Sequence, residues 1–385
     1  MVDIIGAHYQ CHVCGEKDVS VLLGFEDFAL VTSDCRPWKR GGKLGVCRSC
    51  CFVQKITDDV FRKDCEEIYG TYSVYYQAGG QEQRVFEQSR GLSCSRSESI
   101  LIQLQGREAI PVAGKMLDIG CGNGNLLKSF SKYCPSWNLS GLEFDETNRE
   151  QIEQIDHVHA FYSCELTDVT GRFDLISMIH CLEHIIDPVT FLLNVREKLN
   201  RQGLLLIEIP TYTQNPFDLI IADHCTHFDM RSITHLLKLC GFEPIIQLTD
   251  CVPKEITVLA RVMEVIDKRA LTGEETCLQE RLSETIAWLR ENLAVASHMA
   301  ERGPLGIFGT SIAGTWMYNE MPNQISFFVD EDPNRINKLF LDRKVYHPQD
   351  IPADGQVFIP LPHEIAREIS ARMKLKDRFF IPPPF

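Results

Sequence analysis

Hydrophobic residues between positions 115 and 262 fall into short runs that are separated by longer amphipathic stretches. The runs predict buried strands at Met116–Ile119, Leu139–Leu142, Leu175–Met178 and Leu204–Ile209. Helical periodicity fills the intervals, as in Pro188–Leu199, and Gly203 follows that stretch as a stop signal. Two later stretches, GFEPIIQLTD and EITVLARV, predict a terminal hairpin. Strands that alternate with helices predict a doubly wound sheet with helices on both faces.

Both flanks of this region show other patterns. Short apolar runs among many cysteine, glycine and aromatic residues predict a small β-rich module at the start of the chain, followed by a mostly helical stretch. Residues 275–303 predict one long amphipathic helix, and a strand, a glycine turn, a helix and a strand follow it. The predicted boundaries in this α/β protein are 1–80 for the β-rich module, 81–108 for a helical connector, 109–265 for the doubly wound domain, 266–302 for a helical linker and 303–385 for a smaller Rossmann-like domain.

Composition narrows the class of protein. The 385 residues suit two or three domains, and the net charge of −14 argues against a nucleic-acid binder or a polybasic membrane attachment. No apolar run approaches the roughly 20 residues of a membrane span, and the first residues lack the pattern of a signal peptide. We therefore expect a cytoplasmic protein, and the sequence leaves its oligomeric state open. In a reducing compartment, the 16 cysteines predict metal ligands or buried thiols rather than disulfides.

The stretch KMLDIGCGNGNLL carries the strongest chemical signal. It predicts a strand, a glycine turn at Gly120, Gly122 and Gly124, and a helix that begins near Asn125, which is where nucleotide cofactors bind in open α/β sheets. The spacing G-x-G-x-G differs from the G-x-G-x-x-G of a dinucleotide site. Asp118 would repel a diphosphate but would suit the ammonium and sulfonium groups of S-adenosylmethionine.

The next predicted strand ends in SGLEFD, which places Glu143 where an acid can bind both hydroxyls of a ribose. Such an acid serves a dinucleotide and S-adenosylmethionine equally, so the choice between them depends on Asp118 and the glycine spacing. Two alternatives remain at this point: a dinucleotide site, and a turn whose glycines serve only close strand–helix packing.

The pattern hhDhGCGxGxhh resembles class I S-adenosylmethionine-dependent methyltransferases, and the stretch from FDLISMIHCLEH to LLLIEIP is similar to their fourth strand, turn, helix and fifth strand. The flanks are similar to three-part sugar C-methyltransferases, which have an N-terminal zinc module, a central methyltransferase domain and a C-terminal Rossmann-like domain. This resemblance implies a small-molecule substrate, a nucleotide sugar or glycan precursor of deoxysugar or surface-glycan pathways. The cofactor-binding residues are predicted to be Asp118, Gly120, Gly122, Gly124, Asn125, Glu143, Phe144, Cys164, Glu165 and His180.

Two C-x-x-C pairs in the first module predict a metal site. Cys11 with Cys14, and Cys47 with Cys50, supply four thiolates, which is the ligand set of a closed, structural zinc site. Cys35 and Cys51 lie close enough in sequence to leave the fourth ligand uncertain. Buried free thiols are the alternative reading.

Histidines after the predicted fifth strand are the candidate bases, because imidazole titrates near neutral pH. In ADHCTHFD, His224 has Asp223 as an acidic neighbour, and His227 follows three residues later. The resemblance implies that His224 is the best-placed general base. It also implies a role for Tyr76, because the family has a tyrosine-rich segment at this position that reaches into its active site. His184, in CLEHIIDP, completes the set of candidate catalytic residues.

This chain departs from the resembled family in one respect that bears on the reaction. The family's tyrosine–serine segment ends in a histidine, whereas here no histidine lies between His12 and His157. O- or N-methylation of another small molecule is therefore an alternative to C-methylation. A non-catalytic assembly protein that binds partners through its zinc module is a further alternative. The second glycine turn, GIFGTSIAG, leaves open whether the C-terminal unit binds a ligand.

Overall fold

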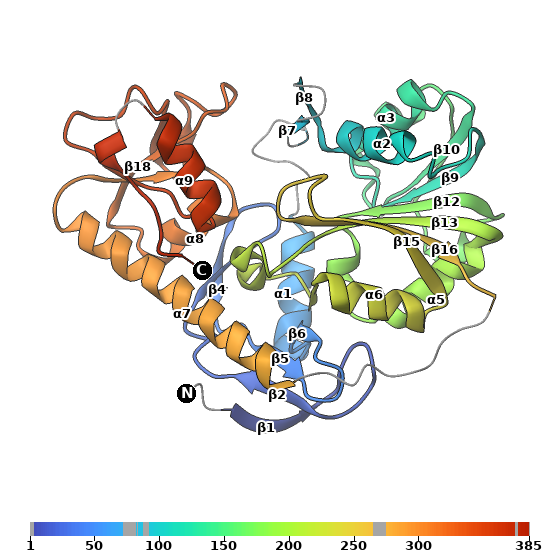
Figure 1. The fold of residues 1–385 in the computed structure, drawn as a ribbon, viewed down its shortest axis with the longest axis horizontal. Helices are drawn as coiled ribbons and strands as arrows, with labels where there is room; N and C mark the ends of the chain where they lie inside the picture. The colour runs from blue at the N-terminus through green and yellow to red at the C-terminus, as the bar shows by residue number, and fades with distance from the viewer. Residues whose placement is uncertain are drawn as a thin grey trace.

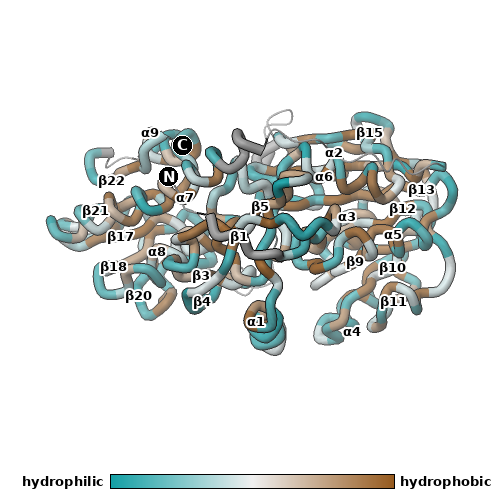
Figure 2. The backbone as a smooth tube through the Cα atoms, turned by 90° about the horizontal axis from the view of Figure 1, so that it is seen from below, coloured by the Kyte–Doolittle hydropathy of each residue, from teal (hydrophilic) through white to brown (hydrophobic). Residues whose placement is uncertain are grey.

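A computed structural model describes residues 4–71, 82, 84–87, 92–264, 275–373 and 376–384. Figure 1 shows three parts: a central sheet covered by helices, a small N-terminal sheet beneath it, and a C-terminal α/β unit beside it. Figure 2 shows hydrophobic residues along the interior strands and hydrophilic residues along outlying turns. Among the helices in the described ranges, none has the length and apolar character that crossing a bilayer requires.

The central sheet has seven strands in the order β11-β10-β9-β12-β13-β16-β15. The strands are β9 (Gly114–Ile119), β10 (Trp137–Leu142), β11 (Val158–Tyr162), β12 (Phe173–Ile179), β13 (Leu199–Pro210), β15 (Phe242–Leu248) and β16 (Glu255–Val262). Strand β16 is antiparallel to both of its neighbours, while β9 to β13 are mutually parallel. The four predicted strands and the terminal hairpin are therefore confirmed, and each of the four strands is longer than predicted at one or both ends.

Helices cover both faces of this sheet, as predicted. They are α2 (Arg96–Gly106), α3 (Asn125–Tyr133), α4 (Arg149–Glu153), α5 (Pro188–Lys198) and α6 (Met230–Leu239). Helices α2 and α3 share one buried cluster with the sheet, whereas α5 and α6 share another on the opposite face (Figure 1). Successive residues along the central strands point alternately into these two clusters. Both faces of the sheet are therefore buried, which explains the continuous apolar runs in the sequence.

The prediction of a mostly helical stretch over residues 81–108 is only partly right. Strands β7 (Arg84–Glu87) and β8 (Leu92–Ser95) pair antiparallel, and α2 begins only at Arg96. Ser95 and Glu98 form a capping box that fixes this start, because each side chain accepts a bond from the other's backbone N–H. The sequence pattern did not distinguish the hairpin from the helix, because polar residues run through both. The cap at Ser95 marks the boundary between them.

The N-terminal part is β-rich, as predicted, but its sheet includes a strand from another part of the chain. Its sheet has the order β1-β2-β5-β6-β14. The strands are β1 (Ile4–Tyr9), β2 (Val19–Leu22), β5 (Leu44–Cys47), β6 (Val53–Lys55) and β14 (Thr226–His227), accompanied by the hairpin β3 (Ala29–Val31) and β4 (Pro37–Arg40) and by α1 (Asp59–Tyr69). Strand β14 comes from the loop after β13, so the central domain supplies the last strand of the N-terminal sheet.

The C-terminal part confirms the predicted long helix and the strand–turn–helix–strand unit. It contains α7 (Glu275–Ala300), β17 (Leu305–Phe308), α8 (Ile312–Glu320), β18 (Ile325–Val329), β19 (Leu339–Phe340), β20 (Arg343–Tyr346), β21 (Gln356–Phe358), α9 (His363–Arg372) and β22 (Phe379–Phe380). The β17–α8 turn is tight, since a Cβ on Gly314 would lie 2.1 Å from the Gly309 oxygen. Trp316 of α8 packs edge-on against Phe28, so this unit and the N-terminal part share one core.

Candidate active site

A cavity of about 1150 Å³ opens at the carboxyl ends of β9, β10 and β12. This is the edge at which ligands bind to open α/β sheets. All three parts of the chain line it: Ser33 and Asp34 from the N-terminal part, Ser311 and Arg335 from the C-terminal unit, and the glycine turn from the central domain. The cavity is therefore a shared site that no part could form alone.

The glycine turn after β9 forms one wall of the cavity. Gly120, Gly122 and Gly124 have φ angles of 69°, 55° and 76°, a region that other L-residues rarely adopt. A Cβ on Gly124 would also lie 2.8 Å from Ile155 Cδ1, so close packing against the segment after α4 adds to the requirement. Asn125 begins α3, and its Nδ2 is buried without a partner among the described residues. Asn125, which lines the cavity, thus offers a ligand a side-chain amide nitrogen that is unpaired within the described part of the chain.

Two acids stand at the ends of neighbouring strands beside this turn. Asp118 of β9 accepts a 2.6 Å bond from the Ser177 hydroxyl, and burial raises its pKa to about 7. Glu143, just after β10, accepts bonds from the backbone N–H groups of Gly122 (3.1 Å) and Phe144 (2.9 Å). These bonds fix the carboxylate while leaving lone pairs on both oxygens for hydroxyl donors. A bound cation beside Asp118 would favour its ionised form.

The remaining predicted cofactor residues lie around the same wall with one exception. Phe144, Glu165 and His180 line the cavity, whereas Cys164 does not. His180 has a φ of 51°, and its Nδ1 lies 3.1 Å from Glu183 Oε1. Burial lowers the pKa of His180 to about 4, so the imidazole is neutral at physiological pH. A neutral ring can lie beside a sulfonium without charge repulsion.

One carboxylate orients the two histidines of the loop after β13. Asp218 belongs to the short 3₁₀ helix η5 (Pro216–Ile220), and it is 1% exposed. His224 Nδ1 lies 2.7 Å from Asp218 Oδ1, and His227 Nδ1 lies 2.7 Å from Oδ2. Both imidazoles therefore donate Nδ1–H to the same acid, which fixes their tautomers and directs each Nε2 away from it.

The two histidines differ in position and in basicity. His224 lines the cavity; burial lowers its pKa, but the bond to Asp218 and its charge outweigh that effect and raise the pKa above the usual value. His227 lies in β14, away from the cavity lining, and burial lowers its pKa to about 4. His227 is thus placed to hold Asp218 rather than to meet a substrate.

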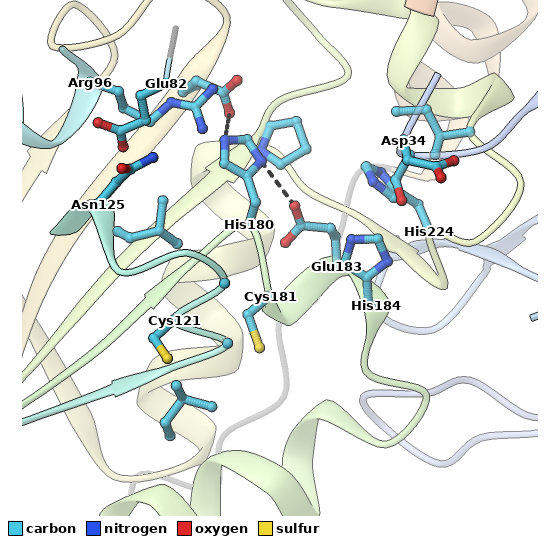
Figure 3. A pocket seen from close by; sticks show the side chains of 18 of the residues that line it. Asp34, Glu82, Arg96, Cys121, Asn125, His180, Cys181, Glu183, His184 and His224 are labelled. Atoms are coloured by element: carbon cyan, nitrogen blue, oxygen red, sulfur yellow. Dashed lines mark hydrogen bonds and ion pairs between the residues drawn. The ribbon is translucent and has the colours of Figure 1, made fainter. Parts of the chain in front are cut away.

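His184 joins His224 at the cavity, and Figure 3 shows both rings beside Glu183. The rings of His184 and His224 meet edge-to-face with centroids 4.7 Å apart. His184 Nδ1 lies 3.1 Å from the backbone oxygen of Asp223 and 3.1 Å from the Tyr69 hydroxyl. The acidic partner of His224 is therefore Asp218, and the neighbouring Asp223 instead serves His184 and Ser33. Tyr76 lies outside the described residues.

The N-terminal part holds this histidine loop in place. Thr226 and His227 pair with Gln54 and Val53 of β6. The fully buried Lys55 directs its Nζ to the backbone oxygens of Leu219 (2.5 Å) and Ile221 (3.1 Å). Desolvation lowers the Lys55 pKa to about 7, so the amine can act as a neutral donor. The loop's backbone bonds thus depend on residues more than 160 positions earlier in the chain.

Four cysteines converge at the edge of the N-terminal sheet. The Sγ atoms of Cys11, Cys14, Cys47 and Cys50 all lie within 4.8 Å of one another. Cys11 and Cys50 are 3.5 Å apart, and Cys14 and Cys47 are 3.6 Å apart. A tetrahedral zinc ion with Zn–S bonds of about 2.3 Å separates its thiolates by roughly 3.8 Å. The donor set fits such an ion, and it excludes Cys35 and Cys51, which are not members of the cluster.

Several charged cavity residues gave no signal in the sequence. Arg96 and Glu255 line the cavity, and Glu208 lies behind the lining. Arg96 Nε lies 3.2 Å from Glu208 Oε1, and His180 Nε2 lies 3.5 Å from Glu255 Oε2. Burial raises the pKa of Glu208 to about 8. These residues come from α2, β13 and β16, whose patterns indicated only secondary structure. Asp218 was missed for the same reason, since a lone acid in an apolar stretch has no spacing to identify it.

Comparison with known proteins agrees with this geometry. Residues 98–247 match the model of a methyltransferase domain family. The mitochondrial ubiquinone biosynthesis O-methyltransferase of Saccharomyces cerevisiae is 30% identical over 118 residues, which cover 29% of this chain and 36% of the relative. The Maricaulis maris ubiquinone biosynthesis O-methyltransferase is 25% identical over 116 residues, which cover 28% of this chain and 45% of the relative. The chain therefore spans less than half the length of these two curated relatives.

A solved structure is also similar to part of the chain. The Burkholderia thailandensis 1,6-didemethyltoxoflavin-N1-methyltransferase with bound S-adenosylhomocysteine has 18% sequence identity and a TM-score of 0.35, covering 44% of this chain and 77% of that one. The family match and the strand order of the central sheet agree on one conclusion. The chain contains a class I S-adenosylmethionine-dependent methyltransferase domain, joined to a four-cysteine N-terminal part and a C-terminal α/β unit.

Proposed function

We propose that this protein transfers the methyl group of S-adenosylmethionine to a small molecule bound in the shared cavity. One observation carries the proposal: the glycine turn, its two acids and His224, which Asp218 holds from behind, belong to the same 1150 Å³ site, with the turn, the acids and His224 on its wall. Catalysis of methyl transfer requires that the acceptor be aligned with the sulfonium and, for many acceptors, that a proton be removed. The cavity has residues suited to both tasks.

The cofactor end of the cavity has a residue for each part of the ligand. Glu143 would accept hydrogen bonds from the ribose hydroxyls, and the backbone of the Gly120–Gly124 turn would follow the ligand closely. Asp118 and Asn125 would bind the amino-acid portion, with the neutral His180 nearby. When bound, S-adenosylmethionine supplies an electrophilic methyl group on a sulfonium sulfur.

At the acceptor end, His224 is the proposed general base. Its Nδ1–H is held by Asp218, so the lone pair of Nε2 is the one available to take a proton from the acceptor. Asp218 stabilises the imidazolium that would result, because a charge-assisted hydrogen bond is stronger than a neutral one. Of the other catalytic candidates, His184 lies at the cavity beside His224, while His227 lies away from the lining and is a positioning residue.

The finer proposal is C-methylation of a nucleotide sugar or glycan precursor. Its support is the three-part order of the chain together with Ser311 and Arg335, which bring the C-terminal unit to the cavity wall. Arg335 is itself held at this wall by Asp330, whose Oδ2 lies 3.3 Å from its Nη1. O-methylation of another small molecule is the second candidate, since the two curated relatives are named as O-methyltransferases.

We further propose that Cys11, Cys14, Cys47 and Cys50 bind one structural zinc ion. The convergence of four Sγ atoms supports this, and four thiolates leave no open position for a substrate. The ion would stabilise the edge of the N-terminal sheet. The ion would hold the N-terminal part in a fixed position. The residues suited to bind the cofactor argue against the alternative of a non-catalytic assembly protein.

Calorimetry with S-adenosylhomocysteine tests the cofactor assignment. Glu143→Ala should weaken binding by about 2–4 kcal/mol, because two hydrogen bonds to a charged group are lost. The control is Glu146→Ala, an exposed acid three residues later whose partner Arg149 also lies at the surface. Equal affinity of wild type and Glu143→Ala would refute the assignment.

A turnover assay with nucleotide sugars and hydroxylated small molecules as acceptors tests the base. His224→Ala should lower kcat by about 10²-fold or more while S-adenosylhomocysteine affinity stays within threefold. His224→Gln should recover nothing, because it restores shape without basicity. Retention of wild-type turnover in His224→Ala would exclude the base role.

A further inference from the structure

We propose that Glu183, His184 and His224 form a binding site for one divalent transition-metal ion inside the cavity. The three residues offer one ligand atom each, and these atoms lie within 4.8 Å of one another. Two imidazoles and one carboxylate on one side of an open cavity are a donor set that leaves coordination positions for water or substrate. The site is separate from the four cysteines, whose thiolates form a closed set.

The carboxylate of Glu183 points to a missing ligand. Glu183 belongs to the short 3₁₀ helix η4 (Leu182–His184) and is 1% exposed. Its Oε1 accepts a 3.1 Å bond from His180, while Oε2 is buried without a partner among the described residues. A buried carboxylate oxygen without a partner costs several kcal/mol unless a cation or a donor satisfies it. A metal ion in the cavity would satisfy this oxygen.

Both histidines are oriented as metal ligands usually are. A ligating histidine commonly donates its other ring N–H to a carboxylate or a backbone oxygen. His224 does so to Asp218 at 2.7 Å, and His184 does so to the Asp223 backbone oxygen at 3.1 Å. In each ring Nδ1 is the nitrogen that is used, which leaves the Nε2 lone pair for an ion. The two rings meet edge-to-face with centroids 4.7 Å apart, and one ligand atom of each lies within 4.8 Å of the other and of a Glu183 carboxylate oxygen.

The donors also indicate the class of ion. Imidazole nitrogens favour Mn²⁺, Fe²⁺, Co²⁺ or Zn²⁺ over Ca²⁺, which takes six to eight oxygen ligands. Ligand atoms on such an ion lie about 3–3.6 Å apart, so side-chain shifts of about an ångström would complete the shell. Figure 3 shows the three side chains on the side of the cavity away from Asn125 and the glycine turn. The open positions of the ion would therefore face the acceptor.

The role of the ion in catalysis rests on the proposed methyl transfer, whereas the binding itself does not. An acceptor hydroxyl or enol that binds the ion would lose its proton to solvent, because a divalent ion lowers the pKa of bound oxygen. The methyl group would then leave the sulfonium sulfur for the acceptor nucleophile, and the sulfur would become a neutral thioether. With the ion bound, His224 acts as a ligand, and its role as a base is confined to the ion-free protein.

Titration with Mn²⁺ tests the site in the full-length protein after brief chelator dialysis. Mn²⁺ is the probe because it prefers nitrogen and oxygen donors to the thiolates of the cysteine cluster, and its free form is measured by electron paramagnetic resonance. We expect one saturable site per chain. His224→Gln and the isosteric Glu183→Gln should each weaken binding at least tenfold, and Asp218→Asn should weaken it about 10–100-fold. The matched control is His159→Gln, an exposed histidine of β11.

Absence of saturable Mn²⁺ binding, or wild-type affinity in both His224→Gln and Glu183→Gln, would overturn the proposal. S-adenosylhomocysteine binding is measured in the same samples, so failure of the cofactor assignment is seen separately from failure of the ion site. Mn²⁺ should also raise turnover at least tenfold in wild type and not in Glu183→Gln. Saturable binding without this rise would overturn the catalytic role of the ion.

Discussion

Replacement of Asp218 by asparagine tests whether one carboxylate sets the orientation and basicity of His224. In wild type the carboxylate accepts two bonds of 2.7 Å, one from each loop histidine, at 1% exposure. Asparagine has the same shape but one acceptor oxygen and no charge, so at most one of the two bonds survives, in a weaker form. Hydrogen bonds to charged groups contribute about 1.5–3 kcal/mol each, so Asp218→Asn should destabilise the fold by roughly that amount or more.

The effect on turnover should exceed the effect on stability. Without the carboxylate, His224 can rotate or adopt the wrong tautomer, and loss of an equivalent aspartate in catalytic triads lowers kcat by about 10⁴-fold. Asp218→Asn should therefore lower kcat by about 10²–10⁴-fold. The rising limb of the pH–rate profile should also move to lower pH, because burial still lowers the His224 pKa while the raising effect of Asp218 is gone.

The assay is the pH dependence of kcat with no divalent cation added, with urea unfolding of each variant. His227→Leu is the matched comparison, since it removes the other partner of Asp218 but leaves the bond to His224. That variant should lose stability yet keep kcat within tenfold and keep the position of the pH limb. An unmoved limb and a kcat within threefold of wild type in a folded Asp218→Asn protein would refute the reasoning.

Two further predictions concern the contact between the N-terminal part and the histidine loop. Burial lowers the Lys55 pKa from 10.5 to about 7, so between these pH values the unfolded chain binds more protons than the folded protein. In urea unfolding, the free energy of unfolding of wild type should therefore rise by up to about 1.4 kcal/mol per pH unit relative to Lys55→Met between pH 7 and pH 10. Parallel stability curves for the two proteins would count against a buried amine. Elemental analysis should find one zinc per chain in wild type and none in Cys47→Ser. In this variant, amide hydrogen exchange should become faster in β5 and β6 and also in the histidine loop at residues 218–228. Unchanged exchange in the loop would show that the cysteine site does not support the loop.

Shared hydrophobic packing is the reason why loss of the zinc ion is expected to affect both the N-terminal part and the histidine loop. Phe52, next to the second cysteine pair, meets Phe228 edge-to-face with centroids 6.4 Å apart. Cys11, Cys47 and Phe52 belong to the same buried cluster as Ile233 of α6. The predicted boundary at residue 80 separates stretches of sequence, but the packing joins the first stretch to the central domain.

The central sheet was predictable from sequence because its information is local. Each strand is buried on both faces, so its apolar run is continuous, and the glycine turn must adopt positive φ wherever it occurs. Spacing along a few residues likewise pointed to Asp118 and Glu143, which lie at the cavity, and to the two C-x-x-C pairs, which converge in one cluster. The hairpin at β7–β8 was missed because polar residues mask its alternation.

Only the tertiary structure decided which groups act together. From the sequence, the acidic neighbour of His224 was the adjacent Asp223. Adjacent residues in an extended loop point in different directions, however, and Asp218 is the acid that reaches the ring. It also could not show that β14 joins the N-terminal sheet, because strand pairing between Thr226 and Gln54 depends on packing across 172 residues. Local patterns therefore determined the elements and the glycine turn, whereas long-range packing determined which acid holds His224 and which donors gather around Glu183.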